Sequence, residues 1–209
     1  WDLTQRAIWH FGKFKKPDFE TALEILQPVI DEHPDFSHAL SYAAFTRALL
    51  ILFSWTEKPE YELTLAVELA KTALAHDPMN PIANTISGFL SAYHKRHAEG
   101  IKLCQRAIEL NPSLAIAYHL RGGIYMFDGQ QSKAIESIEQ AIRLSPYDKM
   151  LPAWLTTLSA TNYLSGDYEA ALEIAESAIQ VEPEYPLALR NRASALAQLE
   201  RIDEAREAL

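Results

Sequence analysis

Three prolines recur at a constant interval. Pro78, Pro112 and Pro146 lie 34 residues apart, from 78 to 112 and from 112 to 146. Small residues keep the same interval, with Ala66, Gly100 and Ala134 twelve residues before these prolines and Ala73, Ala107 and Ala141 five residues before them. A fixed period of this length is typical of arrays of helix pairs in which each unit packs on its neighbours. The pattern therefore predicts an all-α fold.

Glycine and alanine mark the points where helices are expected to cross. Gly88 and Gly122 stand 24 residues before Pro112 and Pro146, and Ala66, Ala134, Ala171 and Ala205 are expected on the facing helices. Larger side chains at a crossing would hold the helix axes at or beyond the usual separation of about 8–10 Å. We therefore expect Ala107 and Ala141 to be buried between helices. Each proline follows a second helix, which it cannot continue.

The spacing divides residues 1–209 into a single array of about six repeats. The repeats are 1–36, which is atypical, then 37–80, 81–114, 115–148, 149–185, and 186–209, which breaks off within its second helix. The second repeat has ten extra residues near 52–62, and we expect a longer first helix followed by a loop at Glu57–Glu60. Three further extra residues lie near Tyr147–Leu151. The chain starts at Trp1 and stops inside a helical pattern, so we expect a fragment of a longer protein.

Composition narrows the possible function classes. The net charge of −9 and the pI near 5.3 argue against nucleic acid, which needs a basic surface. The single cysteine, Cys104, allows no internal disulfide and is expected to be a buried, unreactive thiol. The most apolar stretch, 39–55, is interrupted by Thr46 and Arg47, so we expect a core helix and no membrane span. No signal or transit peptide is recognisable, which predicts a cytoplasmic location.

The residues in step with the prolines carry a family resemblance. In the segment 117–146, Tyr118, Gly122, Tyr125, Ala134, Ala141 and Pro146 fall on the pattern of the tetratricopeptide repeat, and the chain resembles this family over nearly its whole length. The resemblance implies a right-handed superhelical solenoid of antiparallel helix pairs. It also implies a protein–protein interaction scaffold and no enzymatic activity of this chain.

A narrower resemblance rests on four segments: LFSWTEKPE (52–60), HDPMNPIA (76–83), AIRLSPYD (141–148) and GDYEAALEIAESAI (166–179). Together they are similar to the repeat arrays of bacterial signalling proteins that carry a class III adenylate or guanylate cyclase domain, or a winged-helix DNA-binding domain. The resemblance implies a scaffold within such a regulator. The alternative is a ligand- or peptide-sensing module that regulates the linked domain. The chain itself contains neither the cyclase carboxylates in context nor a winged-helix segment.

The family binds partners on the concave face, which the first helix of each repeat lines. Carrying those positions over residue by residue selects His38, Phe45, Thr85, Phe89, Tyr93, His119, Met126, Phe127, Tyr163 and Arg190, with Ala160 and Ser194 among their neighbours. Such an aromatic groove suits an apolar or extended peptide. Phe89 and Phe127 have an alternative reading as core residues between helices. The Lys and Asn clamp by which some relatives hold a terminal carboxylate is missing at these positions.

Other candidate sites have simpler explanations. His94 and His97, with Glu99 nearby, fall in the turn of the third repeat and lack a third metal ligand with suitable spacing. We find no phosphate-binding glycine loop and no nucleophile–base motif, so no cofactor is predicted. Residues 167–209 hold ten acids and four bases, which suits either a basic partner or a solvated face. The exposed end of an unfinished repeat also allows a homodimer.

Overall fold

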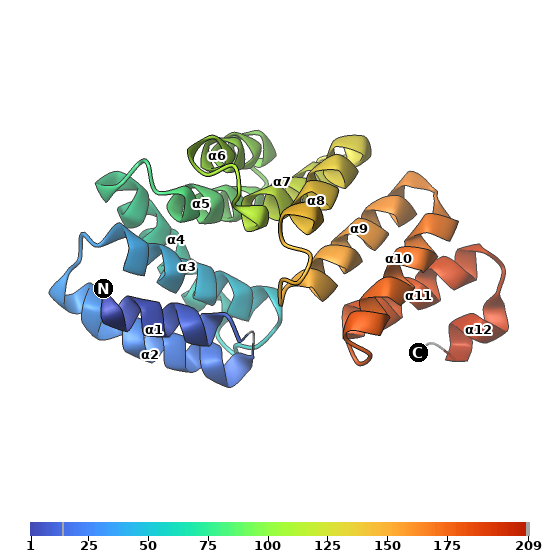
Figure 1. Ribbon diagram of the computed structural model, residues 1–209, viewed down its shortest axis with the longest axis horizontal. Helices are drawn as coiled ribbons and strands as arrows, with labels where there is room; N and C mark the ends of the chain where they lie inside the picture. Colours follow the sequence, from blue (N-terminus) through green and yellow to red (C-terminus); the bar gives the residue numbers. More distant parts are fainter. Residues whose placement is uncertain (14, 208–209) are drawn as a thin grey trace. The chain divides into compact units, whose positions relative to one another are not determined.

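The computed structural model describes residues 1–13 and 15–207, which form twelve α-helices and no strand (Figure 1). The prediction of an all-α fold is confirmed. The helices are α1 (Asp2–Phe11), α2 (Lys16–Glu32), α3 (Ser37–Leu52), α4 (Pro59–His76), α5 (Pro81–Tyr93), α6 (His97–Leu110), α7 (Ala115–Phe127), α8 (Gln131–Leu144), α9 (Leu151–Ser165), α10 (Tyr168–Val181), α11 (Pro186–Gln198) and α12 (Ile202–Glu207).

The helices form two compact units, Trp1–Ala117 and Tyr118–Leu209. In the first unit α1 packs on α2, α3 on α4, and α5 on α6. In the second unit α9 packs on α10, and α11 contacts α9, α10 and α12. Within each unit, helices that follow one another along the chain thus pack together, as expected for an array of helix pairs.

Side-chain caps define the starts of α5 and α10. The Oδ1 of Asn80 accepts hydrogen bonds from the backbone N–H groups of Ile82 and Ala83 at the start of α5, at 2.9 and 3.1 Å. Asp167 accepts one from the N–H of Ala170 at the start of α10. The preceding helix, α9, ends at Gly166, whose φ of +83° strongly favours glycine. These caps satisfy donors that a helix end leaves unpaired.

The glycines predicted at helix crossings lie where a neighbouring helix approaches closely. A Cβ atom built on Gly88 would stand 2.8 Å from Cys104 Sγ and 2.9 Å from the carbonyl oxygen of Gly100. A Cβ atom on Gly122 would stand 2.5 Å from Ile138 Cγ1. Hydrogen is therefore the only substituent that fits without movement. Ala107, Ala141 and Cys104 are fully buried, as predicted.

The extra residues of the second helix pair are distributed differently from the prediction. The longer first helix is confirmed, but the loop lies earlier than the predicted Glu57–Glu60, because Pro59 and Glu60 already belong to α4 and the connection spans 53–58. Proline suits the first turn of a helix, where its missing N–H costs nothing. Both α3, with 16 residues, and α4, with 18, are longer than the 13 and 14 residues of α5 and α6. An ion pair between Arg47 and Glu62 joins the two long helices.

The apolar segment 39–55 forms most of α3, and eleven of this helix's residues are buried. Among the helices described, none is long and apolar enough to cross a membrane.

Candidate functional site

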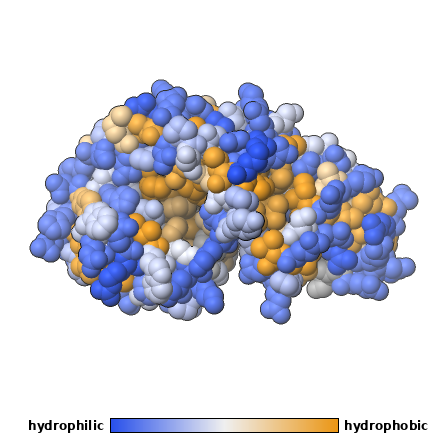
Figure 2. Space-filling model, viewed as in Figure 1, coloured by the Kyte–Doolittle hydropathy of each residue, from blue (hydrophilic) through white to orange (hydrophobic). Residues whose placement is uncertain are grey.

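A pocket of about 220 Å³ lies in the second unit. Its wall comes from the first helices of three successive pairs: Met126 of α7, Ala160, Tyr163 and Leu164 of α9, and Arg190, Asn191 and Ser194 of α11. Helices α7 and α9 supply its apolar wall, while α11 and the hydroxyl of Tyr163 on α9 supply its polar groups. Apolar surface is also visible over α9 in Figure 2.

Hydrogen bonds orient the polar side chains of this pocket. The Nδ2 of Asn191 donates to the carbonyl oxygen of Thr156 at 2.8 Å, which ties α11 to α9. The hydroxyl of Tyr163 accepts from Gln198 Nε2 at 3.2 Å. The Oδ1 of Asn191 is thereby left as an acceptor and the Tyr163 hydroxyl keeps its own proton to donate. The pocket thus combines fixed hydrogen-bonding groups with an apolar wall, the usual composition of a ligand site.

Arg190 supplies the positive charge of the pocket. Its side chain is exposed, and within the described part of the chain it forms no ion pair with a carboxylate. A guanidinium group offers five N–H donors in a planar fork that matches a carboxylate. The pocket can therefore accept an anionic group next to an apolar one.

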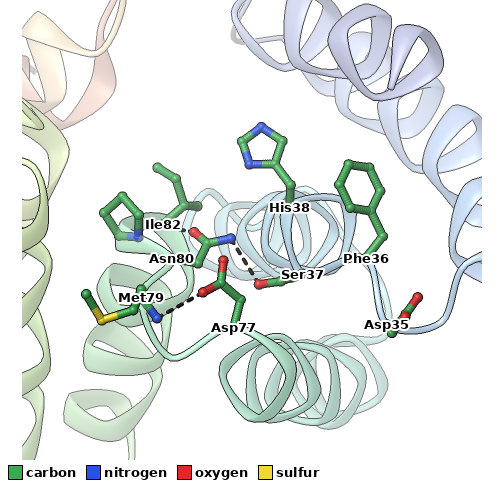
Figure 3. A pocket seen from close by; sticks show the side chains of 9 residues that line it. Asp35, Phe36, Ser37, His38, Asp77, Met79, Asn80 and Ile82 are labelled. Carbon is green, nitrogen blue, oxygen red and sulfur yellow. Dashed lines mark hydrogen bonds between the residues drawn. The ribbon is translucent and has the colours of Figure 1, made fainter.

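A second pocket, of about 410 Å³, lies in the first unit, where the α2–α3 and α4–α5 connections meet (Figure 3). Its polar groups already hold the backbone together. Asn80 donates to the Ser37 hydroxyl at 3.0 Å, and Asp77 accepts from the backbone N–H of Met79 at 3.0 Å. His38 lines the same pocket, and partial burial lowers the pKa of its imidazole. Because Asn80 and Asp77 already form these hydrogen bonds within the protein, they have less hydrogen-bonding capacity left for a ligand.

The predicted groove residues do not all reach a surface. Met126, Tyr163 and Arg190 meet at the pocket of the second unit, which we call the C-terminal pocket. His38 lines the pocket of the first unit, the N-terminal pocket. Phe45 and Thr85 are buried, with 3% and 0% of their surfaces exposed, so they have almost no surface to offer a ligand. For Phe45 the reason is α1, because the Phe11 ring packs on it at 5.0 Å. Thr85 turns its hydroxyl back to the carbonyl of Pro81.

His119 links α7 to α9 and has little surface. Its ring stacks on Trp154 with centroids 5.7 Å apart, and its Nε2 lies 3.1 Å from Thr157 Oγ1. The Thr157 hydroxyl donates to the carbonyl of Ala153, so it accepts from His119 Nε2–H. Nδ1 is buried without a hydrogen-bond partner among the described residues. Burial lowers the pKa of His119 to about 3, because a charged imidazole would lose its hydration there.

The remaining predicted groove residues are aromatic and at least partly exposed. Phe127 ends α7 and Tyr93 ends α5, with 74% and 53% of their surfaces accessible. Phe89 is partly buried. Phe127 is therefore not a core residue, whereas Phe89 is neither fully buried nor fully exposed.

His94 follows the last residue of α5 and His97 begins α6, so both flank the turn that the sequence indicates. In the part of the chain that the structure describes, no group of three or more His, Cys, Asp or Glu residues could hold a metal ion.

Sequence reasoning missed two residues of the C-terminal pocket, Leu164 and Asn191. Each directly follows a predicted residue, Tyr163 or Arg190, near which a pocket was expected. Asn191 also carried a signal of its own, since it is a polar residue about one repeat length after Thr156, to which it bonds.

Two family models match the chain, both described as tetratricopeptide repeat, at residues 115–148 and 163–209. The chain therefore contains tetratricopeptide repeats. Two relatives come from Schizosaccharomyces pombe: anaphase-promoting complex subunit 3, 26% identical over 63% of this chain, and a DnaJ homolog subfamily C member 7 homolog, 29% identical over 50% of it. The matches span only 18% and 25% of those proteins, respectively.

Solved structures of repeat proteins are similar in fold. A thermophilic TPR protein of Thermus thermophilus is 20% identical, with a TM-score of 0.71 over 94% of this chain and 98% of that one. YrrB, a TPR protein with an unusual peptide-binding site, is 18% identical, with a TM-score of 0.55 over 90% and 89%. The human IFIT1 dimer with a capped RNA is 16% identical, with a TM-score of 0.84 over 99% of this chain and 48% of IFIT1. These likenesses support the solenoid fold.

Proposed function

We propose that this chain is a protein-interaction scaffold that binds an extended peptide segment at the C-terminal pocket. One observation carries the proposal: Met126, Tyr163 and Arg190, from three first helices, line a single pocket. These positions correspond to the partner-binding face in the resemblance drawn from the sequence. A pocket that combines an apolar wall with hydrogen-bonding groups suits the side chains and backbone of a peptide.

The comparisons favour a peptide over a small substrate. Tetratricopeptide repeat proteins generally bind protein or peptide partners and do no chemistry, and YrrB carries a peptide-binding site by its description. The wall of the C-terminal pocket lacks His, Cys, Asp and Glu, so it offers no nucleophile with a base. Binding is therefore the function that this pocket supports.

The proposal can be tested by selecting short random peptides on the full chain and measuring their affinities by fluorescence anisotropy. Tyr163→Ala should weaken binding about tenfold or more, because a central aromatic side chain is a frequent hot spot. Glu173→Ala, an exposed position on α10 outside the pocket, is the control and should leave affinity unchanged. Failure to select any peptide, or equal affinities for the two variants, would contradict the proposal.

The alternative function is a ligand- or peptide-sensing module that regulates a linked cyclase or DNA-binding domain in a bacterial signalling protein. It is supported by the four sequence segments described above. A thermal shift screen with peptides and metabolites separates the two functions, because a ligand at 100 times its Kd should stabilise the fold by about 2.7 kcal/mol. A cytoplasmic location, the lack of a nucleic-acid partner and a homodimer through the array end stay predictions.

A further inference from the structure

We infer that the C-terminal pocket selects an acidic peptide residue next to an aliphatic one, with the carboxylate on Arg190. The inference rests on the proposed function and adds the chemistry of the ligand. It follows from three observations: the unpaired charge of Arg190, the hydrogen-bonding groups that line the same pocket, and the apolar wall of that pocket.

The charge of Arg190 stands out among the arginines of α8 to α12. The others each have a carboxylate within 3.7 Å: Arg143 with Glu139, Arg192 with Glu176, Arg201 with Glu204, and Arg206 with Asp203. Arg190 has none among the described residues, although the chain carries an excess of acids, with a net charge of −9. Acidic side chains are therefore plentiful, yet the arginine that lines the pocket is left without one. A carboxylate from outside the chain is the complement of this site.

The neighbouring groups fix how such a ligand would lie. Asn191 follows Arg190 on α11, and its amide is held in place by Thr156. Its Oδ1 can accept a peptide N–H, while the Tyr163 hydroxyl can donate to a peptide carbonyl. A carboxylate on Arg190 would thus place adjacent peptide backbone against Asn191 and Tyr163.

The apolar wall sets the second part of the specificity. Met126, Ala160 and Leu164 line the same pocket, whose volume of about 220 Å³ is small for a ligand site and suits a single side chain. Methionine is unbranched and adapts to ligands of different shape, so leucine, isoleucine and methionine should all be accepted. One cation in an acidic chain does not suit a nucleic acid, which needs several phosphate contacts.

The test uses the full chain and a displayed library of short random peptides, followed by affinity measurements on single peptides. Selected peptides should be enriched in Asp or Glu beside Leu, Ile or Met. Arg190→Ala should weaken them about ten- to hundredfold, the range expected for a hydrogen bond to a charged group. Arg190→Lys should fall between, because it keeps the charge and loses the planar fork. Arg192→Ala is the matched control, since Arg192 lies on the same helix and pairs with Glu176.

Replacing the peptide's acid by its amide should cost the wild-type chain as much affinity as Arg190→Ala, and it should cost the Arg190→Ala variant little. Peptides that need Tyr163 but show no acid preference would overturn this inference and leave the proposed function standing. If no peptide binds, both fail. A single-stranded RNA probe that binds the wild-type chain and loses binding in Arg190→Ala would assign the arginine to phosphate and would also overturn the inference.

Discussion

The α7–α8 and α9–α10 crossings of the second unit place different residues at the same repeat position. On α7 this residue is Gly122, and sixteen residues later α8 presents Ile138. On α9 it is Ser159, and sixteen residues later α10 presents Ala175. All four are buried. A glycine opposite a large residue and a serine opposite a small one fill similar space, so the repeat conserves the volume of the pair and varies its members.

The two crossings also differ in their polar contacts. The Ser159 hydroxyl donates to the carbonyl oxygen of Ala171 at 2.7 Å. Ala134 holds the equivalent position in α8, and its carbonyl oxygen lies 3.1 Å from where a Gly122 Cβ would stand. At this repeat position the α9–α10 crossing thus has a hydrogen bond where the α7–α8 crossing has a close approach. Helices α7 and α8 are hydrogen-bonded elsewhere, because the Ser137 hydroxyl accepts from Arg121 Nε at 3.1 Å and donates to the Tyr118 carbonyl at 2.8 Å.

The largest effect is expected from truncating Ile138, the large residue that faces Gly122 at the α7–α8 crossing. Ile138→Ala should destabilise the chain by about 2–5 kcal/mol, because Ile138 is fully buried and a cavity would remain beside Gly122. Chemical denaturation followed by circular dichroism measures the change. Ile202→Ala is the control, because that side chain is 45% exposed. Equal costs for the two variants would show that Ile138 does not fill the crossing.

A smaller cost is expected where a crossing is overfilled. Ala141 is fully buried on α8, and Ala141→Leu should cost about 1–3 kcal/mol by overpacking. The same change at Ala197, which is exposed on α11, should have little effect on the melting temperature. An unchanged melting temperature for Ala141→Leu would contradict the register of this repeat.

The sequence predicted these crossings because glycine and alanine recur in step with proline. Backbone contact demands small side chains, so Gly88, Gly122 and Ala141 could be assigned from spacing alone. Phe45 could not be assigned in this way. Its burial depends on Phe11 in α1, and α1 belongs to the atypical first repeat, where no periodic pattern fixes the packing.

The candidate site was predicted in part for a similar reason. The repeat register brings Met126, Tyr163 and Arg190 to equivalent helices, and these three line one pocket. Whether a given arginine finds a carboxylate depends on side-chain conformations across neighbouring helices, so the unpaired state of Arg190 was not predictable.

The segments that resemble cyclase-linked arrays have local structural roles. HDPMNPIA contains the Asn80 cap of α5, and GDYEAALEIAESAI contains Gly166 and the Asp167 cap of α10. Such residues are needed at helix ends whatever domain is attached. They are therefore weaker evidence for a cyclase parent than for the repeat itself.

The volume argument can be tested by converting one crossing into the other. Gly122→Ser combined with Ile138→Ala reproduces the residue types of Ser159 and Ala175. The introduced hydroxyl would have room and the Ala134 carbonyl as an acceptor, so the double variant should cost less than the sum of the single variants. A coupling of about 0.5–3 kcal/mol in a double-mutant cycle is expected. Additive costs would mean that the two positions do not compensate.

A pH effect is expected at the contact that joins α7 to α9. The pKa of His119 falls to about 3 in the folded chain because of burial, against about 6.5 when unfolded. The neutral ring is therefore the native form, its contribution is complete above pH 6.5, and stability is lost as pH falls from 6.5 toward 3. The loss approaches about 1.4 kcal/mol per pH unit below 6.5.

Urea denaturation at a series of pH values between about 7 and 5 measures this loss. This range crosses the pKa of the unfolded state and stays above the pKa of about 3 in the folded state. His119→Gln should make the pH dependence clearly shallower, whatever its own stability. His38→Gln should reduce it less, because His38 is only partly buried and burial lowers its pKa less strongly. Identical slopes for the wild-type chain and His119→Gln would show that the folded state accommodates a charged ring at this position.

The smallest effect is expected from removing the hydrogen bond that Ser159 forms at the α9–α10 crossing. Ser159→Ala removes the donor to the Ala171 carbonyl without opening a large cavity, and it should cost about 0.5–1.5 kcal/mol. Ser177→Ala is the control, since that hydroxyl bonds to the Glu173 carbonyl at the surface of α10. A difference between the two variants in urea denaturation would show that the buried hydroxyl stabilises its crossing. If Ser159→Ala cost no more than Ser177→Ala, the serine would act only as a small residue, and its hydrogen bond would not stabilise the α9–α10 crossing.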